Sequence, residues 1–239
     1  MLFYLKSQTE RVSNEEIEQL INEGQYEEVA QLLYENLGHM RFNELLENEY
    51  SLDKEEIKGS VNFLPFAFKE SHIVTTNFDN VIKNVYEDNR FNFSDTIYGF
   101  DEDEIAKFLN DEYRLLIKLH GKANYHRKRI LTKEEYEKFY SEHNLKLTLE
   151  KIMHNTLLFI GCSLNTDRTI KTMEEIIQEN HSLPKHYVFL QMNDIETKED
   201  IEERLAKANI FPVWYDDEEH DESIEAFLLL LTEGTLYDN

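Results

Sequence analysis

The stretch IVTTNFDN, residues 73–80, decides how the fold is interpreted. It opens with β-branched residues, which are typical of a buried strand, and then breaks off at Thr76, Asn77 and Asp79. A helical pattern, DNVIKNVYED, follows at 79–88. A strand that ends in polar residues before a helix either caps that helix or holds a ligand, so the other strands have to be compared with this one.

The same order of strand and helix recurs after residue 72. Short apolar runs alternate with amphipathic stretches, most of them ten or more residues long. The apolar runs are HIVTTNF, YRLLIKLHG, TLLFIGCSL, HYVFLQMN and IFPVWYDD, with FSDTIYGF at 93–100 as a weaker candidate. Nearly continuous apolar strands that alternate with helices indicate parallel strands buried on both faces. The predicted fold is therefore α/β, a Rossmann-like doubly wound and mainly parallel sheet.

The N-terminal part of the chain has a different pattern. Its apolar residues recur at spacings of three and four, and Ser13 with Glu16 forms a capping-box candidate. We expect residues 1–70 to form a helical segment packed on or inserted into the core. Residues 71–239 are expected to form the Rossmann-like core.

The chain is strongly acidic, with 49 acidic against 25 basic side chains and a formal net charge of -24. Such a charge repels phosphates and disfavours a nucleic-acid-binding face, which leaves small molecules or proteins as partners. The acidic residues are spread through helical stretches, which is typical of solvated helix faces. Whether the chain forms a homo-oligomer or binds a protein partner stays open.

The single cysteine, Cys162, cannot form an internal disulfide or a thiolate zinc site, so no metal is expected. No base is adjacent to it, which favours a packing role. No apolar stretch approaches the ~18 to 20 residues of a membrane span. The start of the chain has neither a cationic lead nor a cleavage site. We therefore expect a cytoplasmic protein without a membrane segment.

Polar and small residues follow four of the predicted strands. In parallel sheets, ligands bind outside the carboxyl ends of the strands. The residues at these ends are Thr76, Asn77 and Asp79; His120 and Gly121; Gly161, Cys162, Ser163 and Leu164; and Asn193 and Asp194. The predicted ligand site lies at this edge of the sheet.

Some of these residues have a structural explanation beside the functional one. Asp79 can cap the following helix, whereas the Asn77 amide can donate to and accept from one ligand. His120 is either a satisfied core residue or a general base, with Gly121 leaving space for a ligand. The basic cluster HRKR at 126–129 is either a solvated loop or an attractor of anions.

No GxGxxG, GxxxxGK[ST] or HExxH motif is present, which disfavours ordinary dehydrogenases, P-loop proteins and zinc proteases.

Taken in order, TTNFD, IKLHG, ILTKEEYEKFY and LLFIGCSL followed by NTDRTI resemble the sirtuin-like domain family of bacteria. In that family an Asn-Asp pair, a His-Gly pair and a Gly-x-Ser-Leu turn follow successive strands. The resemblance runs from about residue 72 to 195. Sirtuin-like proteins bind NAD and break the bond between nicotinamide and ribose.

The resemblance implies a role for each matching residue. Asn77 looks like the asparagine that positions the reacting ribose or the attacking water. Asp79 looks like the aspartate that holds the nicotinamide carboxamide, and His120 like the base that acts on the ribose hydroxyls. The further nucleotide contacts that it implies are Thr76, Gly121, Gly161, Ser163, Leu164 and Asn193. NAD is then the substrate.

Two departures from the family pattern refine this expectation. The chain cannot form the four-cysteine zinc module of deacylating sirtuins, which favours the zinc-free, NAD-hydrolysing branch associated with bacteriophage defence. No Gly-Ala-Gly strand-loop precedes Thr75, since the first glycine, Gly24, stands in a helical context. The chain is thus a shortened form, a weak NAD binder, or a protein with another role. The alternative to an NAD hydrolase is a non-catalytic module that senses NAD or ADP-ribose or binds a protein.

Overall fold

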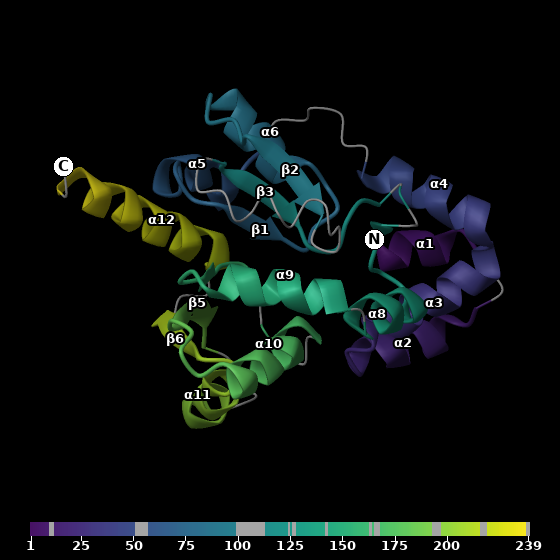
Figure 1. The fold of residues 1–239 in the computed structure, drawn as a ribbon. Coiled ribbons are helices and arrows are strands. Elements are labelled where there is room, and N and C mark those ends of the chain that lie inside the picture. The colour runs from purple at the N-terminus through teal and green to yellow at the C-terminus, as the bar shows by residue number, and fades with distance from the viewer. Residues whose placement is uncertain are drawn as a thin grey trace. The chain divides into compact units, whose positions relative to one another are not determined.

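Figure 1 shows the helices and strands of the chain in a computed structural model. The chain forms two compact units. The structure describes residues 1–9, 12–50, 57–98, 113–123, 125, 128–141, 143–162, 164, 168–192, 197–215 and 219–237. Unit 1 comprises Met1–Glu56, Ser71–Asn84 and Asn92–Glu142, and unit 2 comprises Ile57–Glu70, Val85–Phe91 and His143–Asn239. The elements that the structure describes within residues 1–70 are helices, and the division of the chain near residue 70 stays a prediction.

Unit 1 combines a helical segment with a parallel sheet. Its elements are α1 (Leu2–Ser7), α2 (Asn14–Asn22), α3 (Tyr26–Leu37), α4 (His39–Tyr50), β1 (Ile73–Thr75), β2 (Asp95–Tyr98), β3 (Leu115–Lys118) and α8 (Lys133–Ser141), together with the first half of α6 (Val81–Asp88). The strand order is β1-β3-β2, and both pairings are parallel. The central strand β3 is buried along its whole length, as its apolar sequence predicts.

The helices of unit 1 share a core with the loops that follow β1 and β3. Ser13 caps α2, because its side chain accepts from the Glu16 backbone N–H, so the predicted capping contact is confirmed. The core of this unit consists of Leu5, Val12, Ile17, Val29, Leu33, Phe42, Leu45, Leu46 and Ala123. Phe78, in the loop after β1, and Leu131, ahead of α8, pack against it. The helical segment therefore supports the loops at the carboxyl ends of the strands.

Unit 2 contains a second parallel sheet, in the order β4-β5-β6. Its elements are η1 (Ser60–Phe63), α5 (Leu64–Ala67), α9 (His143–Met153), β4 (Leu158–Phe159), α10 (Arg168–Glu179), β5 (His186–Gln191), α11 (Lys198–Ala206), β6 (Ile210–Tyr215) and α12 (His220–Tyr237), with the second half of α6. The Phe189 ring stacks on Tyr215 at 4.4 Å and on Phe227 at 4.2 Å. Both units combine parallel strands with helices, so the predicted α/β, Rossmann-like fold class is confirmed.

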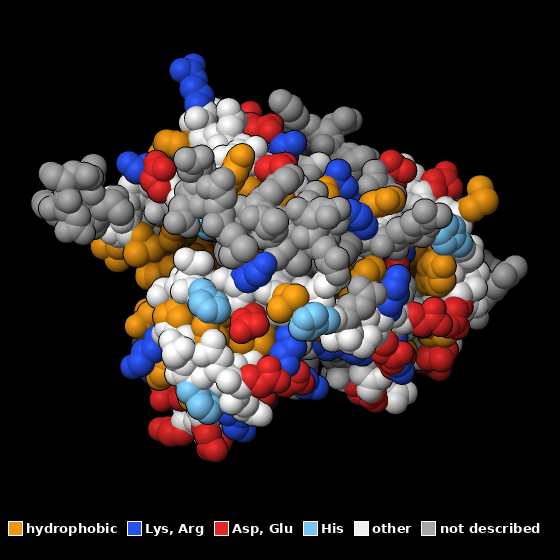
Figure 2. Space-filling view, viewed as in Figure 1, with side chains coloured by type: hydrophobic (Ala, Val, Ile, Leu, Met, Phe, Trp, Pro, Cys, Tyr) orange, Lys and Arg blue, Asp and Glu red, His pale blue; other side chains and the backbone are white. Residues whose placement is uncertain are grey.

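Acidic side chains are dispersed over the surface that Figure 2 shows. They lie at many separate places on this face, interspersed with Lys and Arg side chains, as expected for solvated helix faces. Among the described helices, none has both the length and the apolar character needed to cross a bilayer.

Candidate functional site

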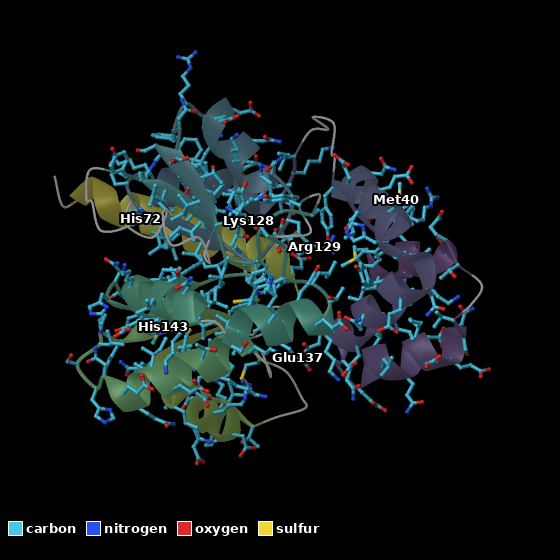
Figure 3. All side chains as sticks on the ribbon, turned by 45° about the vertical axis from the view of Figure 1, so that its right-hand side comes forward. Met40, His72, Lys128, Arg129, Glu137 and His143 are labelled. Carbon is cyan, nitrogen blue, oxygen red and sulfur yellow. The ribbon has the colours of Figure 1, made fainter. Side chains whose placement is uncertain are left out.

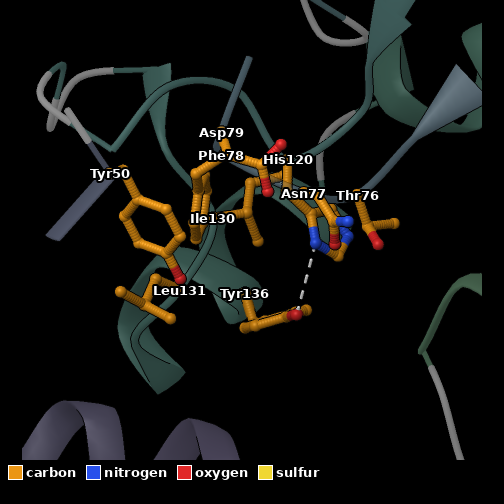
Figure 4. A pocket seen from close by; sticks show the side chains of 9 residues that line it. All are labelled: Tyr50, Thr76, Asn77, Phe78, Asp79, His120, Ile130, Leu131 and Tyr136. Atoms are coloured by element: carbon orange, nitrogen blue, oxygen red, sulfur yellow. Dashed lines mark hydrogen bonds between the residues drawn. The ribbon is translucent and has the colours of Figure 1, made fainter. Parts of the chain in front are cut away.

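Unit 1 contains a pocket at the carboxyl ends of β1 and β3 (Figure 4). Its volume is about 320 Å³, near the lower end of the ~300 to 1,000 Å³ that is usual for ligand pockets. The lining residues are Tyr50, Thr76, Asn77, Phe78, Asp79, His120, Ile130, Leu131 and Tyr136. The structure therefore brings together four of the predicted site residues, Thr76, Asn77, Asp79 and His120, from two strand ends.

Residues 76–80, here called the Asn77 loop, are held by short-range hydrogen bonds. The Asn77 backbone N–H donates to Thr75 Oγ1 at 3.1 Å, and the Val81 N–H donates to Asp79 Oδ1 at 2.9 Å. Asp79 thus satisfies the first backbone N–H of α6 and also lines the pocket, while its contact with a ligand stays a prediction. Asn77 is exposed at the pocket, where its amide can meet a ligand.

A buried lysine holds the same loop from the neighbouring strand. Lys118, the last residue of β3, donates from Nζ to the Phe78 carbonyl at 2.8 Å and to the Asp79 carbonyl at 2.5 Å. Its side chain is 2% exposed. Sequence reasoning missed this residue, although a lysine inside an apolar strand is a visible signal.

His120 is 6% exposed and lies between two tyrosines of α8. The Tyr140 hydroxyl is 2.9 Å from Nε2, and the Tyr136 hydroxyl is 3.5 Å from Nδ1. Both phenol rings meet the imidazole edge-on. A neutral imidazole has one donor and one acceptor nitrogen, so one phenol accepts and the other donates. His120 is thus a satisfied buried residue that also lines the pocket, as Tyr136 does.

Position 121 has to be a glycine because the backbone at Lys128 passes close to its α-carbon. Its φ is +81°, and a Cβ at this position would lie 1.6 Å from the Lys128 carbonyl oxygen. The space beside its α-carbon, which we expected to admit a ligand, is therefore filled by the chain itself. A nucleotide contact through Gly121 stays a prediction.

Arg129 fixes the segment that leads into α8 (Figure 3). Its side chain is fully buried and donates to Glu135 Oε1 at 2.7 Å and to Asn43 Oδ1 at 2.6 Å. Glu135 in turn accepts from the Leu131 backbone N–H at 2.9 Å. Arg129 is therefore a structural residue and not part of a solvated basic loop. His126 and Arg127 of the predicted basic cluster lie outside the described residues.

Tyr50, at the end of α4, forms a wall of the pocket. Its ring meets the Phe78 ring edge-on, with 5.5 Å between the centroids. Burial raises the pKa of the Tyr50 phenol, and the charges of Asp79 and Glu49 act in the same direction. No motif around Tyr50 connects this helical residue with the site.

The remaining predicted site residues are not part of this pocket's lining. Gly161 and Leu164 belong to unit 2, where the Leu164 carbonyl accepts from Arg204 Nη1 at 2.6 Å. Ser163 and Asn193 lie outside the described residues. Cys162, for which we expected a packing role, is exposed, so that expectation is wrong. No group of three or more His, Cys, Asp or Glu side chains within the described ranges is placed to hold a metal ion.

Comparison with known proteins identifies the family. The family model described as a SIR2-like domain matches residues 71–213. This range includes both strands that carry the pocket loops, β1 and β3, and the helix α8 that contacts His120. A search of curated proteins finds no match to the chain. Because the family match covers more than half of the sequence, the chain belongs to the sirtuin-like, or SIR2-like, domain family.

Proposed function

We propose that the chain binds NAD in this pocket and cleaves the bond between its nicotinamide and ribose. One observation carries the proposal. Asn77, Asp79 and His120, which the family resemblance assigns to the nicotinamide and its ribose, line the same pocket of about 320 Å³. A pocket of this size fits one part of a dinucleotide, as expected for the nicotinamide-ribose half.

The polar groups of the pocket suit this bond cleavage. When the C1′–N bond breaks, its electron pair moves to the ring nitrogen and leaves an oxocarbenium-like centre on the ribose. Water then bonds to C1′ and loses a proton, which yields nicotinamide and ADP-ribose. The Asn77 amide offers a fixed dipole to the ribose or the water. One Asp79 oxygen caps α6, and the other can accept a hydrogen bond from the carboxamide.

The environment of His120 determines how it can act as a base. Both ring nitrogens face phenols, so a ribose hydroxyl reaches His120 either through Tyr136 or by displacing it. Tyr136 suits this role because it lines the pocket and makes the longer of the two contacts. Its hydroxyl can pass a proton between the ribose and Nδ1.

We further infer that the chain works in the zinc-free, NAD-hydrolysing branch, in the cytoplasm and in defence against bacteriophage. Its single cysteine cannot supply a four-thiolate zinc module, which supports this branch over protein deacylation. For the adenosine side of NAD we propose Gly161, Ser163, Leu164 and Asn193.

A second candidate is a nucleotide sensor that binds NAD or ADP-ribose without turnover. The observation that favours it is the burial of His120, whose two nitrogens are both engaged by tyrosines. A base that stays in this state would not reach a substrate hydroxyl.

Calorimetry with NAD and with ADP-ribose, combined with an assay for nicotinamide, separates the two candidates. For the hydrolase we expect binding of NAD, release of nicotinamide, and loss of release in His120→Ala with binding retained. The sensor would bind either nucleotide and release nothing. Asn77→Ala should release nicotinamide much more slowly than the wild type. Its control is Asn22→Ala, which changes an exposed asparagine at the end of α2 and should behave as the wild type. If neither nucleotide binds, both candidates are wrong.

A further inference from the structure

Lys118 is an unusual residue for its position. It ends the buried central strand β3, in the sequence LLIKLHG, and its side chain is 2% exposed. Removing an ammonium group from water costs several kcal/mol unless its N–H groups find acceptors. A buried lysine therefore needs a specific set of partners.

All three N–H donors of Lys118 have acceptors in the Asn77 loop. Nζ lies 2.8 Å from the Phe78 carbonyl oxygen, 2.5 Å from the Asp79 carbonyl oxygen and 3.3 Å from Asn80 Oδ1. These acceptors belong to three consecutive residues. One ammonium thus donates to two successive backbone carbonyls of a partly buried loop.

This contact differs from the other hydrogen bonds of the loop. The bonds from the Asn77 N–H to Thr75 and from the Val81 N–H to Asp79 each span two residues of the chain. The bond from Lys118 to the Asp79 carbonyl spans 39 residues and joins the loop to the neighbouring strand. Lys118 lies two residues before His120 in the sequence. The end of β3 therefore both supports the Asn77 loop and supplies His120 to the pocket lining.

We propose that Lys118 is a positioning residue of the NAD site, whose ammonium holds the Asn77 loop so that Asn77 and Asp79 face the ligand. The proposal rests on the proposed NAD function. The ammonium acts from behind the loop and does not touch the substrate. Its effect on catalysis passes through the geometry of Asn77 and Asp79.

The charges around Lys118 suggest a pH dependence. The pKa of Lys118 is lowered to about 8, mainly by burial; the carboxylate of Asp79 opposes this shift, and the ammonium groups of Lys122 and Lys83 add to it. Below this pH the group donates three hydrogen bonds. Above it the neutral amine keeps two N–H groups and turns a lone pair toward an acceptor oxygen. Order in the Asn77 loop, and with it kcat/KM, is therefore expected to fall as the pH rises through about 8.

The first test needs no ligand. Backbone amide exchange of residues 77–81 is measured in the wild type, in Lys118→Met and in the control Lys138→Met, which changes an exposed lysine of α8. We expect exchange at least tenfold faster in Lys118→Met and unchanged in Lys138→Met. Unchanged exchange in Lys118→Met would overturn the positioning role, whatever the protein does with NAD.

The second test links the loop to the ligand. NAD turnover, or binding of ADP-ribose if nothing is released, is measured across the pH range around 8 for the wild type, Lys118→Met and Lys118→Arg. We expect kcat/KM or affinity to fall at least tenfold in Lys118→Met, with partial recovery and no alkaline decline in Lys118→Arg, since arginine keeps its charge. Wild-type kinetics in folded Lys118→Met would overturn the proposal. A wild-type protein that neither binds nor cleaves NAD would instead overturn the proposed function, and the exchange result would stand.

Discussion

The Tyr140 hydroxyl lies 2.9 Å from Nε2 of His120. Tyr136, one helical turn earlier on α8, contacts Nδ1 at 3.5 Å and stacks on the Tyr140 ring, with 5.6 Å between the centroids. The two phenols therefore hold the plane of the imidazole, and in either neutral tautomer one phenol donates and the other accepts. The helix that supplies them begins where Glu135 accepts from the Thr132 backbone N–H at 3.0 Å, which anchors its first turn.

Replacing Tyr140 by Phe should weaken catalysis without removing substrate binding. The variant loses the close contact to Nε2, which is worth about 1 kcal/mol of folding stability, and His120 can then rotate or change tautomer. We expect kcat to fall about tenfold, a barrier change of ~1.4 kcal/mol, while KM changes little. Steady-state kinetics of NAD cleavage measure both constants. A rise in KM at constant kcat would contradict this role for Tyr140.

Tyr50 should contribute to binding through its ring. Tyr50→Phe keeps the edge-on contact with Phe78 and should bind NAD within about twofold of the wild type. Tyr50→Ala removes a pocket wall, and we expect an affinity loss of roughly tenfold, or ~1.4 kcal/mol, by calorimetry. Tyr26→Ala, a truncation of a tyrosine that is 57% exposed, is the control. Equal affinities of Tyr50→Ala and Tyr26→Ala would show that α4 takes no part in the site.

Gly121→Ala should destabilise the protein more than an ordinary glycine substitution at positive φ. Gly24, with φ of +72°, offers a matched control, because nothing lies within 4 Å of a Cβ placed there. Gly24→Ala should cost about 1 kcal/mol for the strained backbone alone. Gly121→Ala adds a collision with the Lys128 carbonyl. We therefore expect the free energy of unfolding, measured with denaturant, to fall by ~3 kcal/mol or more. Similar losses in the two variants would contradict the close approach of Lys128.

Stability should fall in mild acid because of His186. This histidine of β5 is fully buried, and its Nδ1 accepts from the Leu157 backbone N–H at 3.2 Å. Burial lowers its pKa to about 4. Above the ordinary value of about 6.5 it is neutral in both states, whereas below it the unfolded chain gains the proton first. The free energy of unfolding should thus drop by up to about 3 kcal/mol between pH 6.5 and 4.

His186→Asn separates this effect from the titration of the many carboxylates. The asparagine side chain retains an acceptor for the Leu157 N–H but does not titrate. Denaturant unfolding at a series of pH values should show a shallower acid decline in this variant than in the wild type. Parallel pH profiles would mean that His186 does not contribute.

Much of the fold follows from the spacing of apolar residues. The β-branched start of the stretch at 73–80 predicts β1, and the helical spacing that follows predicts α6. The run LLIKLHG predicts the buried strand β3. These patterns are local, so they can be read without knowing the neighbours of each segment.

The candidate site could be predicted only in part, because its details depend on contacts between distant segments. Asn77 and His120 could be identified as polar residues at strand ends. The partners of Lys118 and the position of Tyr50 follow from how strands and helices pack, which spacing does not encode. The four-residue spacing of Tyr136 and Tyr140 indicates a shared helix face, but not that His120 lies against it.

The central claim is that the pocket around Asn77 cleaves NAD. The most direct measurement is the release of nicotinamide from NAD, followed by chromatography, for the wild type, Asn77→Ala and Asn22→Ala. We predict nicotinamide and ADP-ribose in equal amounts from the wild type and from Asn22→Ala, and a rate at least a hundredfold lower from Asn77→Ala, a barrier increase of ~2.7 kcal/mol. A folded wild type that binds NAD and releases no nicotinamide, or an Asn77→Ala variant with the wild-type rate, would contradict it.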